Sequence, residues 1–377
     1  MMRMGLDSIL RATVVLAALL VVALPVLGEE DGGEATDEIL RFVERASAWY
    51  PDSKFEVADD ERTVTPSGAY RVVTIERACD NKFLAGTQVV LVDERSRTAW
   101  LGGVARLPAR GAASENLQEF LTGFLPDILR ESLRLKAEVA WDERPVDGAA
   151  VIPFSLRIDT GYGEHLRPAA VTADGTLMTM GYPLSLDTDP VQQRRSLLRG
   201  APEVIWDRPA TDEAVVEIVE FSDLECPACR GRWELIEEVL AAHPDTVRHG
   251  MVSLPLTTIH PWAFRAASAS WCVSVQDPTM LIPFKEMFYA LQPEMSVSMV
   301  TPTATDFVVG YGLDEAAFEA CYLAEESVSA VHDQLALGAM LGINATPTYI
   351  VNGWLVQVPA PEWFPAMVER LAAGEEP

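Results

Sequence analysis

Positive charge is scarce in this chain of 377 residues. The sequence holds 29 lysines and arginines against 56 aspartates and glutamates, which gives a formal net charge of −27 at pH 7. An excess of carboxylates on this scale repels nucleic acid and anionic lipid surfaces. No acidic run is long enough to be a dedicated tail, so we interpret the charge as a solvated acidic surface and expect no nucleic-acid partner.

Closely spaced metal ligands are also missing. Only one pair of cysteines has the CxxC spacing, and the five histidines form no close metal-type pair. These histidines are His165, His243, His249, His260 and His332. Structural zinc sites need about four ligands, so half of a zinc site is the weaker interpretation of the CxxC pair. We expect neither a metal nor a cofactor.

A long apolar run occurs only at the N-terminus. Residues 12–27 are apolar, Arg3 and Arg11 lie ahead of them, and small-residue positions precede Glu29. This pattern is typical of a secretory signal peptide. We expect residues 1–28 to be removed and the mature protein to be periplasmic or otherwise extracytoplasmic. The alternative is an uncleaved N-terminal helix that anchors the chain in a membrane.

A short internal repeat organises the first half of the chain. Lys54–Arg62 (KFEVADDER) recurs as Lys136–Arg144 (KAEVAWDER), each after a helix pattern and before alternating strand patterns. We predict an α+β domain of two helix-plus-antiparallel-sheet repeats, with Gly102-Gly103 and Gly181 closing corresponding hairpins. Chance similarity in a chain rich in Glu, Ala and Val is the alternative.

The strongest chemical signal is Cys226-Pro227-Ala228-Cys229. A buried strand pattern leads into it and an amphipathic helix pattern follows, so the dithiol should lie at a helix N-terminus. The amides and the positive end of the helix dipole stabilise a thiolate there, which should bring the pKa of Cys226 below the value of about 8.5 of a free thiol. Cys226 is the expected nucleophile, and Cys229 is the thiol that resolves a mixed disulfide.

A second signal is the segment Ala345–Gly353 (ATPTYIVNG), where Pro347 stands just ahead of an apolar strand pattern. Cis bonds occur at only about 5% of X-Pro positions, but the upstream CxxC favours a cis Thr346–Pro347 bond. Such a bond would let the Thr346 backbone pair with an extended substrate. An ordinary trans proline at a strand start is the alternative.

Together these segments resemble the DsbA-like branch of the thioredoxin superfamily. The resemblance covers residues 215–371 and includes VEFSDLECPAC (219–229), His260-Pro261 with the small-residue helix after it, residues 313–321 and residues 345–353. It implies an α/β thioredoxin-like fold with a helical insertion. It also implies an exposed nucleophile at Cys226, a buried Cys229 and a cis Pro347.

The same resemblance suggests roles for three further residues. Glu220 stands where this superfamily has a buried acid, and a pKa raised by burial would let it relay a proton to Cys229; a salt-bridged or solvent-facing carboxylate is the alternative. Similar proteins carry a structural disulfide at the positions of Cys272 and Cys321, with two buried free thiols as the alternative. Cys79 then has no partner, so it either forms an intermolecular bridge or fills a buried site as a small residue.

Two features argue against strong oxidising power. No histidine stands between the two cysteines to stabilise the thiolate, and Glu225 opposes it by like charge. A less stabilised thiolate implies a lower reduction potential.

The predicted organisation has five parts. They are a signal peptide (1–28), a flexible start (29–36), an α+β domain (37–186, with repeats 37–108 and 115–186), a helical linker (187–202) and a thioredoxin-like domain (203–373) with a helical insertion at about 261–341. We predict an exported thiol-disulfide oxidoreductase that acts on protein thiols and disulfides, in a direction left open among oxidase, isomerase and reductase.

Partners and competing functions follow from the same resemblance. The family implies a membrane redox partner, and the layout resembles that of dimeric disulfide isomerases, in which the extra domain pairs two subunits. One alternative is a substrate-binding or chaperone-like protein in which redox activity is secondary. Another is a reductase dedicated to a single partner.

Overall fold

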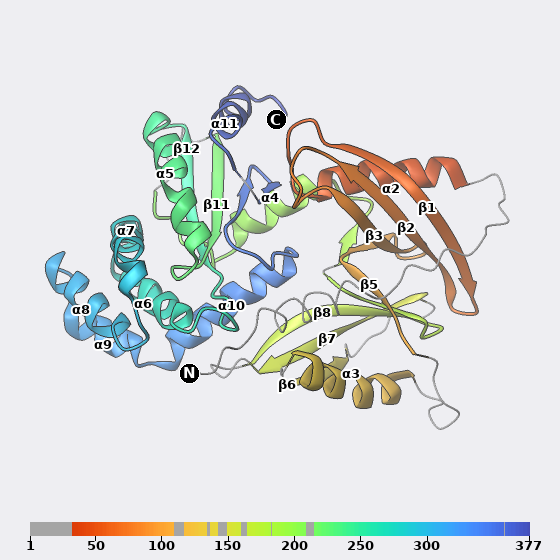
Figure 1. Ribbon diagram of the computed structural model, residues 1–377, viewed down its shortest axis with the longest axis horizontal. Coiled ribbons are helices and arrows are strands. Elements are labelled where there is room, and N and C mark those ends of the chain that lie inside the picture. Colours follow the sequence, from red (N-terminus) through yellow and green to blue (C-terminus); the bar gives the residue numbers. More distant parts are fainter. Residues whose placement is uncertain are drawn as a thin grey trace, which may run out of the picture. The chain divides into compact units, whose positions relative to one another are not determined.

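The computed structural model describes residues 32–108, 117–133, 136–141, 149–159, 164–181, 183–208, 215–357 and 359–377 (Figure 1). They form two compact units. The first contains the chain up to Glu44 together with Asp52–Asp189, and the second contains Arg45–Pro51 and Pro190–Pro377. The expected signal peptide (1–28) lies outside the described residues.

In the first unit, a helix followed by four antiparallel strands occurs twice. The first set is α2 (Gly32–Ala46), β1 (Lys54–Thr65), β2 (Gly68–Ala78), β3 (Gly86–Asp93) and β4 (Thr98–Leu101). The second set is α3 (Leu117–Leu133), β6 (Lys136–Trp141), β7 (Val151–Asp159), β8 (Glu164–Thr172) and β9 (Leu177–Met180). The two similar sequence segments begin β1 and β6, which are the first strands of their sets.

Each set supplies a fifth strand to the other sheet. β5 (Gly103–Arg106) follows β4 in the chain but pairs with β9, and β10 (Pro183–Ser185) follows β9 but pairs with β4. The sheets therefore have the orders β1-β2-β3-β4-β10 and β5-β9-β8-β7-β6. The hairpins predicted at Gly102 and Gly181 are wrong, because the chain passes there from one sheet to the other.

Close backbone approach explains the two glycines. A Cβ on Gly102 would lie 2.2 Å from the carbonyl oxygen of Met180, and a Cβ on Gly181 would lie 2.7 Å from that of Leu101. Neither distance leaves room for a side chain, so the exchange of strands requires glycine at both positions.

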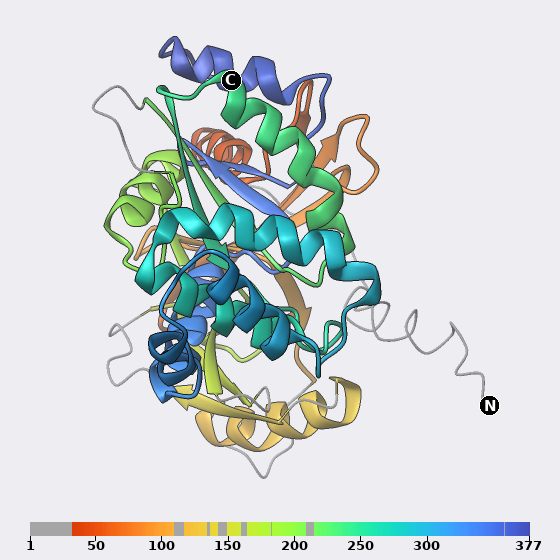
Figure 2. The ribbon, with the colours of Figure 1, turned by 90° about the vertical axis from the view of Figure 1, so that its left-hand side faces the viewer.

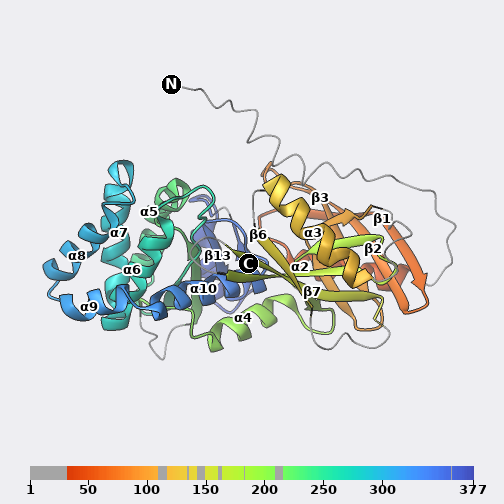
Figure 3. The same ribbon diagram turned by 90° about the horizontal axis from the view of Figure 1, so that it is seen from below.

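The helix of the second set covers one face of its sheet (Figures 1 and 3). Leu121 and Leu125 of α3 belong to the same buried cluster as Phe154 and Leu156 of β7 and Val171 of β8. The apolar residues on one side of the strands, which recur with a period of two, and those on the apolar face of the helix therefore pack together in one core.

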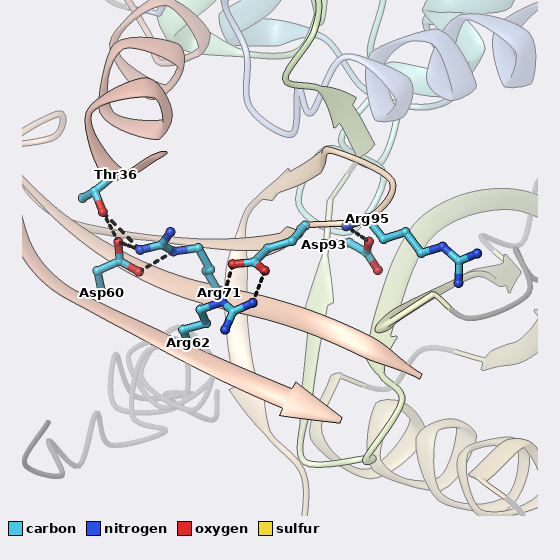
Figure 4. Close-up of polar contacts among 7 residues, drawn as sticks. Thr36, Asp60, Arg62, Arg71, Asp93 and Arg95 are labelled. Atoms are coloured by element: carbon cyan, nitrogen blue, oxygen red, sulfur yellow. Dashed lines mark hydrogen bonds and ion pairs between the residues drawn. The ribbon is translucent and has the colours of Figure 1, made fainter. Parts of the chain in front are cut away.

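Polar contacts tie the first sheet to its neighbours inside this unit (Figure 4). Arg71 on β2 donates hydrogen bonds of 2.9 and 2.7 Å to the two carboxylate oxygens of Asp60 on β1, and Thr36 of α2 contacts both residues. Asp93 at the end of β3 accepts hydrogen bonds of 2.8 and 2.9 Å from the backbone amides of residues 150 and 151, where β7 begins.

The second unit is built on a four-stranded sheet of order β12-β11-β13-β14. These strands are β12 (Val247–Ser253), β11 (Val216–Ser222), β13 (Thr348–Val351) and β14 (Trp354–Val356); the flanking helices are α4 (Pro190–Gly200), α5 (Pro227–Ala242) and α11 (Phe364–Ala372). β11 runs parallel to β12 and antiparallel to β13. Its residues are almost all buried, as expected of a central strand.

A helical segment is inserted between β12 and β13, and Figure 2 presents it toward the viewer in teal to blue. It contains α6 (Ala263–Gln276), η1 (Pro278–Met280), α7 (Leu281–Leu291), η2 (Gln292–Glu294), α8 (Val300–Gly310), α9 (Glu315–Tyr322) and α10 (Glu325–Met340). Phe284, Phe288, Phe307 and Phe318 of these helices share one buried cluster with Ile218 of β11. The predicted fold class is thereby confirmed, with a thioredoxin-like C-terminal half that carries a helical insertion.

Two local predictions need correction. The stretch expected to be a flexible start, residues 29–36, is helical from Gly32 onward. Residues 45–51, expected in the N-terminal domain, belong to the second unit. Their place follows from packing, because Trp49 donates from its backbone amide to the carbonyl of Leu355 at 2.6 Å and its ring lies 5.2 Å from that of Trp363.

Candidate functional site

The two cysteines of the CxxC segment begin helix α5. Cys226 has an extended backbone (φ −73°, ψ 117°) at the N-cap position, and Pro227 is the first helical residue. Proline suits that position because its missing N–H would have no partner there and its φ is already helical. The Cys226 amide donates to the carbonyl of Asp223 at 3.0 Å, which closes the turn between β11 and α5.

The two thiols differ sharply in their environments. Hydrogen bonding to the Cys229 thiol, helped by Thr346 and the first amides of α5, outweighs burial and lowers the pKa of Cys226 to about 5. Cys229 is fully buried, and burial together with the neighbouring Cys226 raises its pKa well above that of a free thiol. At neutral pH the ionised thiol is therefore Cys226.

The expectation that Cys226 is exposed is wrong, because only 5% of its surface is accessible. Its sulfur lies under the loop that precedes β13, and its Sγ is 3.6 Å from the carbonyl oxygen of Thr346. The Thr346–Pro347 peptide bond is cis. Pairing of β13 with β11, at Thr348 opposite Phe221, brings this loop beside the cysteines.

Glu220 lies on β11, completely buried, but it does not have the raised pKa expected for a proton relay. Burial alone would raise its pKa, yet the ammonium of Lys285 and the imidazole of His249 outweigh burial and lower it to about 2. Lys285 Nζ donates to Glu220 Oε2 at 2.8 Å, and both side chains are 1% exposed. Glu220 is thus a salt-bridged carboxylate, which was the alternative considered for it.

Glu220 belongs to a longer series of buried, interacting charged side chains that was not predicted from the sequence. His249 of β12 lies 3.5 Å from Glu220 Oε2 through Nε2 and donates through Nδ1 to Asp207 at 2.8 Å. Lys285 also lies 3.4 Å from the centre of the Trp233 ring. A signal was available: the sequence has four lysines, Lys54, Lys82, Lys136 and Lys285, and the last stands alone in an apolar stretch of the second half.

The insertion contributes a second polar contact to the site. Gln292 is buried at the end of α7, and its side-chain amide donates to the carbonyls of Leu224 at 2.9 Å and of Cys226 at 3.1 Å. Both acceptors belong to the turn that carries the nucleophile. The insertion therefore holds the backbone of this turn directly, a role that no pattern in the sequence predicted.

The remaining cysteines lie apart from the CxxC pair in the chain. Cys272 of α6 and Cys321 of α9 form a disulfide. Cys79, just after β2, is a half-buried free thiol whose Sγ donates to the carbonyl of Asn81 at 3.5 Å. Among the described residues, no three His, Cys, Asp or Glu side chains gather as metal ligands. None of the described helices has the length and apolar character needed to cross a membrane.

Residues 211–370 match a family model described as Thioredoxin. Curated relatives include Na(+)/H(+) antiporter NhaA 1 of Mycobacterium sp. (strain KMS), 29% identical over 44% of this chain and 24% of that protein. The protein of the same name from Mycolicibacterium gilvum (strain PYR-GCK) is 30% identical, again over 44% and 24%. The chain thus spans about a quarter of the length of these relatives.

Several solved structures match about half of this chain. BdbD from Bacillus subtilis in its oxidised form is 23% identical, over 45% of this chain and 94% of that one, with a TM-score of 0.41. Wolbachia pipientis alpha-DsbA1 is 16% identical, over 48% and 96%, with a TM-score of 0.42. The catalytic domain of Proteus mirabilis ScsC is 18% identical, over 49% and 97%, with a TM-score of 0.40.

Proposed function

We propose that the protein is an exported thiol-disulfide oxidoreductase that exchanges disulfides with protein substrates; the match of residues 211–370 to the Thioredoxin family model supports this. One observation carries the proposal. Cys226 is an N-cap thiol with a pKa of about 5, and the partner thiol three residues later is fully buried with a raised pKa. This asymmetry makes one cysteine the attacking or leaving group and keeps the other for resolution.

In the oxidising direction the protein begins with a Cys226–Cys229 disulfide and the substrate begins as a dithiol. A substrate thiolate attacks Cys226 Sγ, the Cys226–Cys229 bond breaks, and Cys229 leaves and takes up a proton. A second substrate thiolate then attacks the substrate sulfur of the mixed disulfide, and Cys226 leaves as a thiolate. The substrate gains one disulfide, the protein loses one, and two electrons pass to the protein; the reducing direction is the reverse.

The low pKa of Cys226 favours the oxidising direction. A stable Cys226 thiolate stabilises the reduced protein and makes Cys226 a good leaving group. Thioredoxin, with a thiol pKa of about 7, has a potential of about −270 mV, and DsbA, with a pKa of about 3.5, has one of about −120 mV. We expect a potential between these two values, measured by equilibration with glutathione. A value outside this range would contradict the expectation.

Thr346 and Pro347 are assigned to substrate binding in this proposal. The Thr346 carbonyl lies beside Cys226 Sγ at the start of β13. An extended substrate segment could pair with this backbone as an added strand, which would hold the substrate sulfur near the nucleophile. The substrates are therefore expected to be unfolded or extended cysteine-containing chains.

Export and partners complete the proposal. Removal of residues 1–28 would place the dithiol in an oxidising compartment, where the Cys272–Cys321 bridge also persists. N-terminal sequencing of the secreted protein should find Glu29 first.

Reoxidation of Cys226 and Cys229 needs an external oxidant, which we assign to a membrane redox partner. The N-terminal domain is a candidate for pairing two subunits. Sodium–proton exchange is not carried over from the antiporter relatives, because the chain spans only a quarter of them.

The proposal is tested by single substitutions in the full chain. Cys226→Ser should reduce disulfide exchange with insulin and with a dithiol peptide to background. Cys79→Ser is the matched control, because it removes the other free thiol outside the CxxC pair, and it should leave exchange unchanged. Full exchange activity in the Cys226→Ser protein would refute the proposal. If the Cys226→Ser protein lacks exchange but still binds unfolded substrate chains as the wild type does, a substrate-binding or chaperone-like function is primary and the redox site is secondary.

A further inference from the structure

The low pKa of Cys226 arises in a motif without a histidine and next to an acidic residue. The two residues between the cysteines are Pro227 and Ala228, and Glu225 immediately precedes Cys226. The structure nevertheless brings one histidine to this turn from a different part of the chain. His260 lies in the loop between β12 and α6 (residues 254–262).

A single buried carboxylate holds both His260 and the cysteine turn. Asp223, whose side chain is 0% exposed, accepts a hydrogen bond of 2.6 Å from His260 Nδ1. The same oxygen, Oδ2, accepts from the Leu256 amide at 2.9 Å, while Oδ1 accepts from the Glu225 amide at 2.8 Å. The backbone carbonyl of Asp223 accepts from Cys226. The imidazole and the nucleophile are thus fixed by the same residue.

The charge environment of His260 includes the nucleophile. The hydrogen bond to Asp223 raises the pKa of His260 against the opposing effect of partial burial, and the charges of Asp223, Cys226 and Glu225 raise it further. Electrostatic interaction between two groups is mutual: a thiolate that favours the imidazolium is itself favoured by the imidazolium. The pair therefore coexists as thiolate and imidazolium at pH values between the pKa of Cys226 and that of His260.

The acidic neighbour has its own partner elsewhere. Glu225 Oε2 accepts a hydrogen bond of 2.6 Å from the Trp262 amide, at the N-terminus of α6. A helix N-terminus favours a carboxylate. The negative charge next to the nucleophile is thereby engaged by α6, which weakens the objection that it would suppress the thiolate.

We propose that His260, oriented by Asp223, is a positioning residue whose imidazolium stabilises the Cys226 thiolate from outside the CxxC motif. This inference rests on the proposed function, because it assigns His260 to the nucleophile of that reaction. Its consequence is that the redox poise of the protein is set in part by the loop between β12 and α6 rather than by the two residues between the cysteines alone.

The first test is a substitution that removes the charge and keeps a hydrogen-bond donor. His260→Gln can still donate an amide hydrogen to Asp223. In the full-length reduced protein, thiolate absorbance at 240 nm against pH should give a pKa of Cys226 higher by about 1, the order of magnitude expected for the loss of one interacting charge in a partly exposed site. The equilibrium constant for oxidation of glutathione by the disulfide form of the protein should fall about tenfold. This corresponds to a reduction potential lower by about 30 mV for this two-electron couple.

Matched controls separate this effect from a general disturbance. His243→Gln makes the same chemical change at the C-cap of α5, at the opposite end of that helix from Cys226, and it should leave the titration unchanged. Cys226→Ser should remove the absorbance step and so identify it. A Cys226 pKa unchanged by His260→Gln, or equal shifts in the two histidine variants, would overturn the inference.

A second measurement needs no variant at the histidine. The pKa of His260, followed by NMR of its ring proton, should be higher in the reduced wild-type protein, where the thiolate is present, than in the oxidised protein, where the disulfide carries no charge. Equal values in the two states would overturn the inference even if His260→Gln failed to fold. Failure of the proposed function would look different, since insulin and peptide exchange would then be absent in the wild type while both titrations remained measurable.

Discussion

Replacement of Lys285 by methionine should destabilise the second unit strongly, and the size of the effect follows from its surroundings. The Lys285–Glu220 ion pair is 2.8 Å long and both side chains are 1% exposed. Lys285→Met keeps most of the side-chain volume but leaves Glu220 with His249 as its remaining cationic neighbour, 3.5 Å away. Loss of one partner from a buried ion pair costs about 3–5 kcal/mol.

The pKa of Glu220 leads to a similar magnitude and supplies the sign of the pH dependence. Its value of about 2 in the folded protein lies below the value of about 4.3 for an unperturbed glutamate, and a difference of this size corresponds to about 3 kcal/mol. Because the folded pKa is depressed, the stabilisation is present above about pH 4.3 and is lost as the pH falls toward 2. In Lys285→Met, burial dominates and the pKa of Glu220 rises, so the destabilisation should be largest at pH 7–8 and smaller near pH 5.

Urea unfolding measured by circular dichroism between pH 5 and 8 checks this prediction. Lys136→Met, at a lysine that is 83% exposed in the other unit, is the matched control and should change stability by less than about 0.5 kcal/mol. Lys285→Met combined with Glu220→Gln should recover part of the loss, because no buried charge is then left without its partner. The reasoning is refuted if Lys285→Met leaves the transition in place at pH 7, or if its cost is the same at every pH.

Three further results are expected. Gly102→Ala should destabilise the first unit by more than about 2 kcal/mol, because the new Cβ meets a backbone carbonyl, whereas Gly103→Ala, with open space around its Cβ, should cost less than about 1 kcal/mol in thermal unfolding. Equal costs at the two glycines would contradict the close approach. Removing the Cys272–Cys321 bridge by alanine at both positions should cost about 4 kcal/mol in urea unfolding, from its 49-residue separation; an unchanged midpoint would argue against this. The pKa of His249 is raised, because its buried partner Asp207 outweighs the effect of burial. The stabilisation of the folded state by protonated His249 is therefore present below about pH 6.5 and is lost as the pH rises through the folded pKa. Replacement of His249 by glutamine should remove this stabilisation from the pH dependence of the free energy of unfolding.

Local sequence was sufficient for the parts of the site that depend on neighbours in the chain. The strand pattern before Cys226 and the helix pattern after Cys229 already placed the dithiol at a helix N-terminus, where the structure has it. The apolar segment after Pro347 indicated the strand that lies beside it. The repeat of Lys54–Arg62 at Lys136–Arg144 indicated two related helix-plus-sheet sets, because the period of each pattern is itself local.

Only the tertiary structure decided where charges and strands meet across long separations. β5 and β10 are too short for their patterns to say which sheet receives them, and backbone pairing settled the exchange at Gly102 and Gly181. The sign of the pKa shift of Glu220 depended on Lys285, 65 residues away in the insertion. A dithiol motif consists of neighbouring residues in the sequence. The pKa of each thiol, however, depends on its desolvation and on charged side chains of other helices, strands and loops that lie near it in the fold. The sequence therefore determined the nucleophile and the type of fold, and the packing of the insertion on the sheet decided the electrostatics that govern its reactivity.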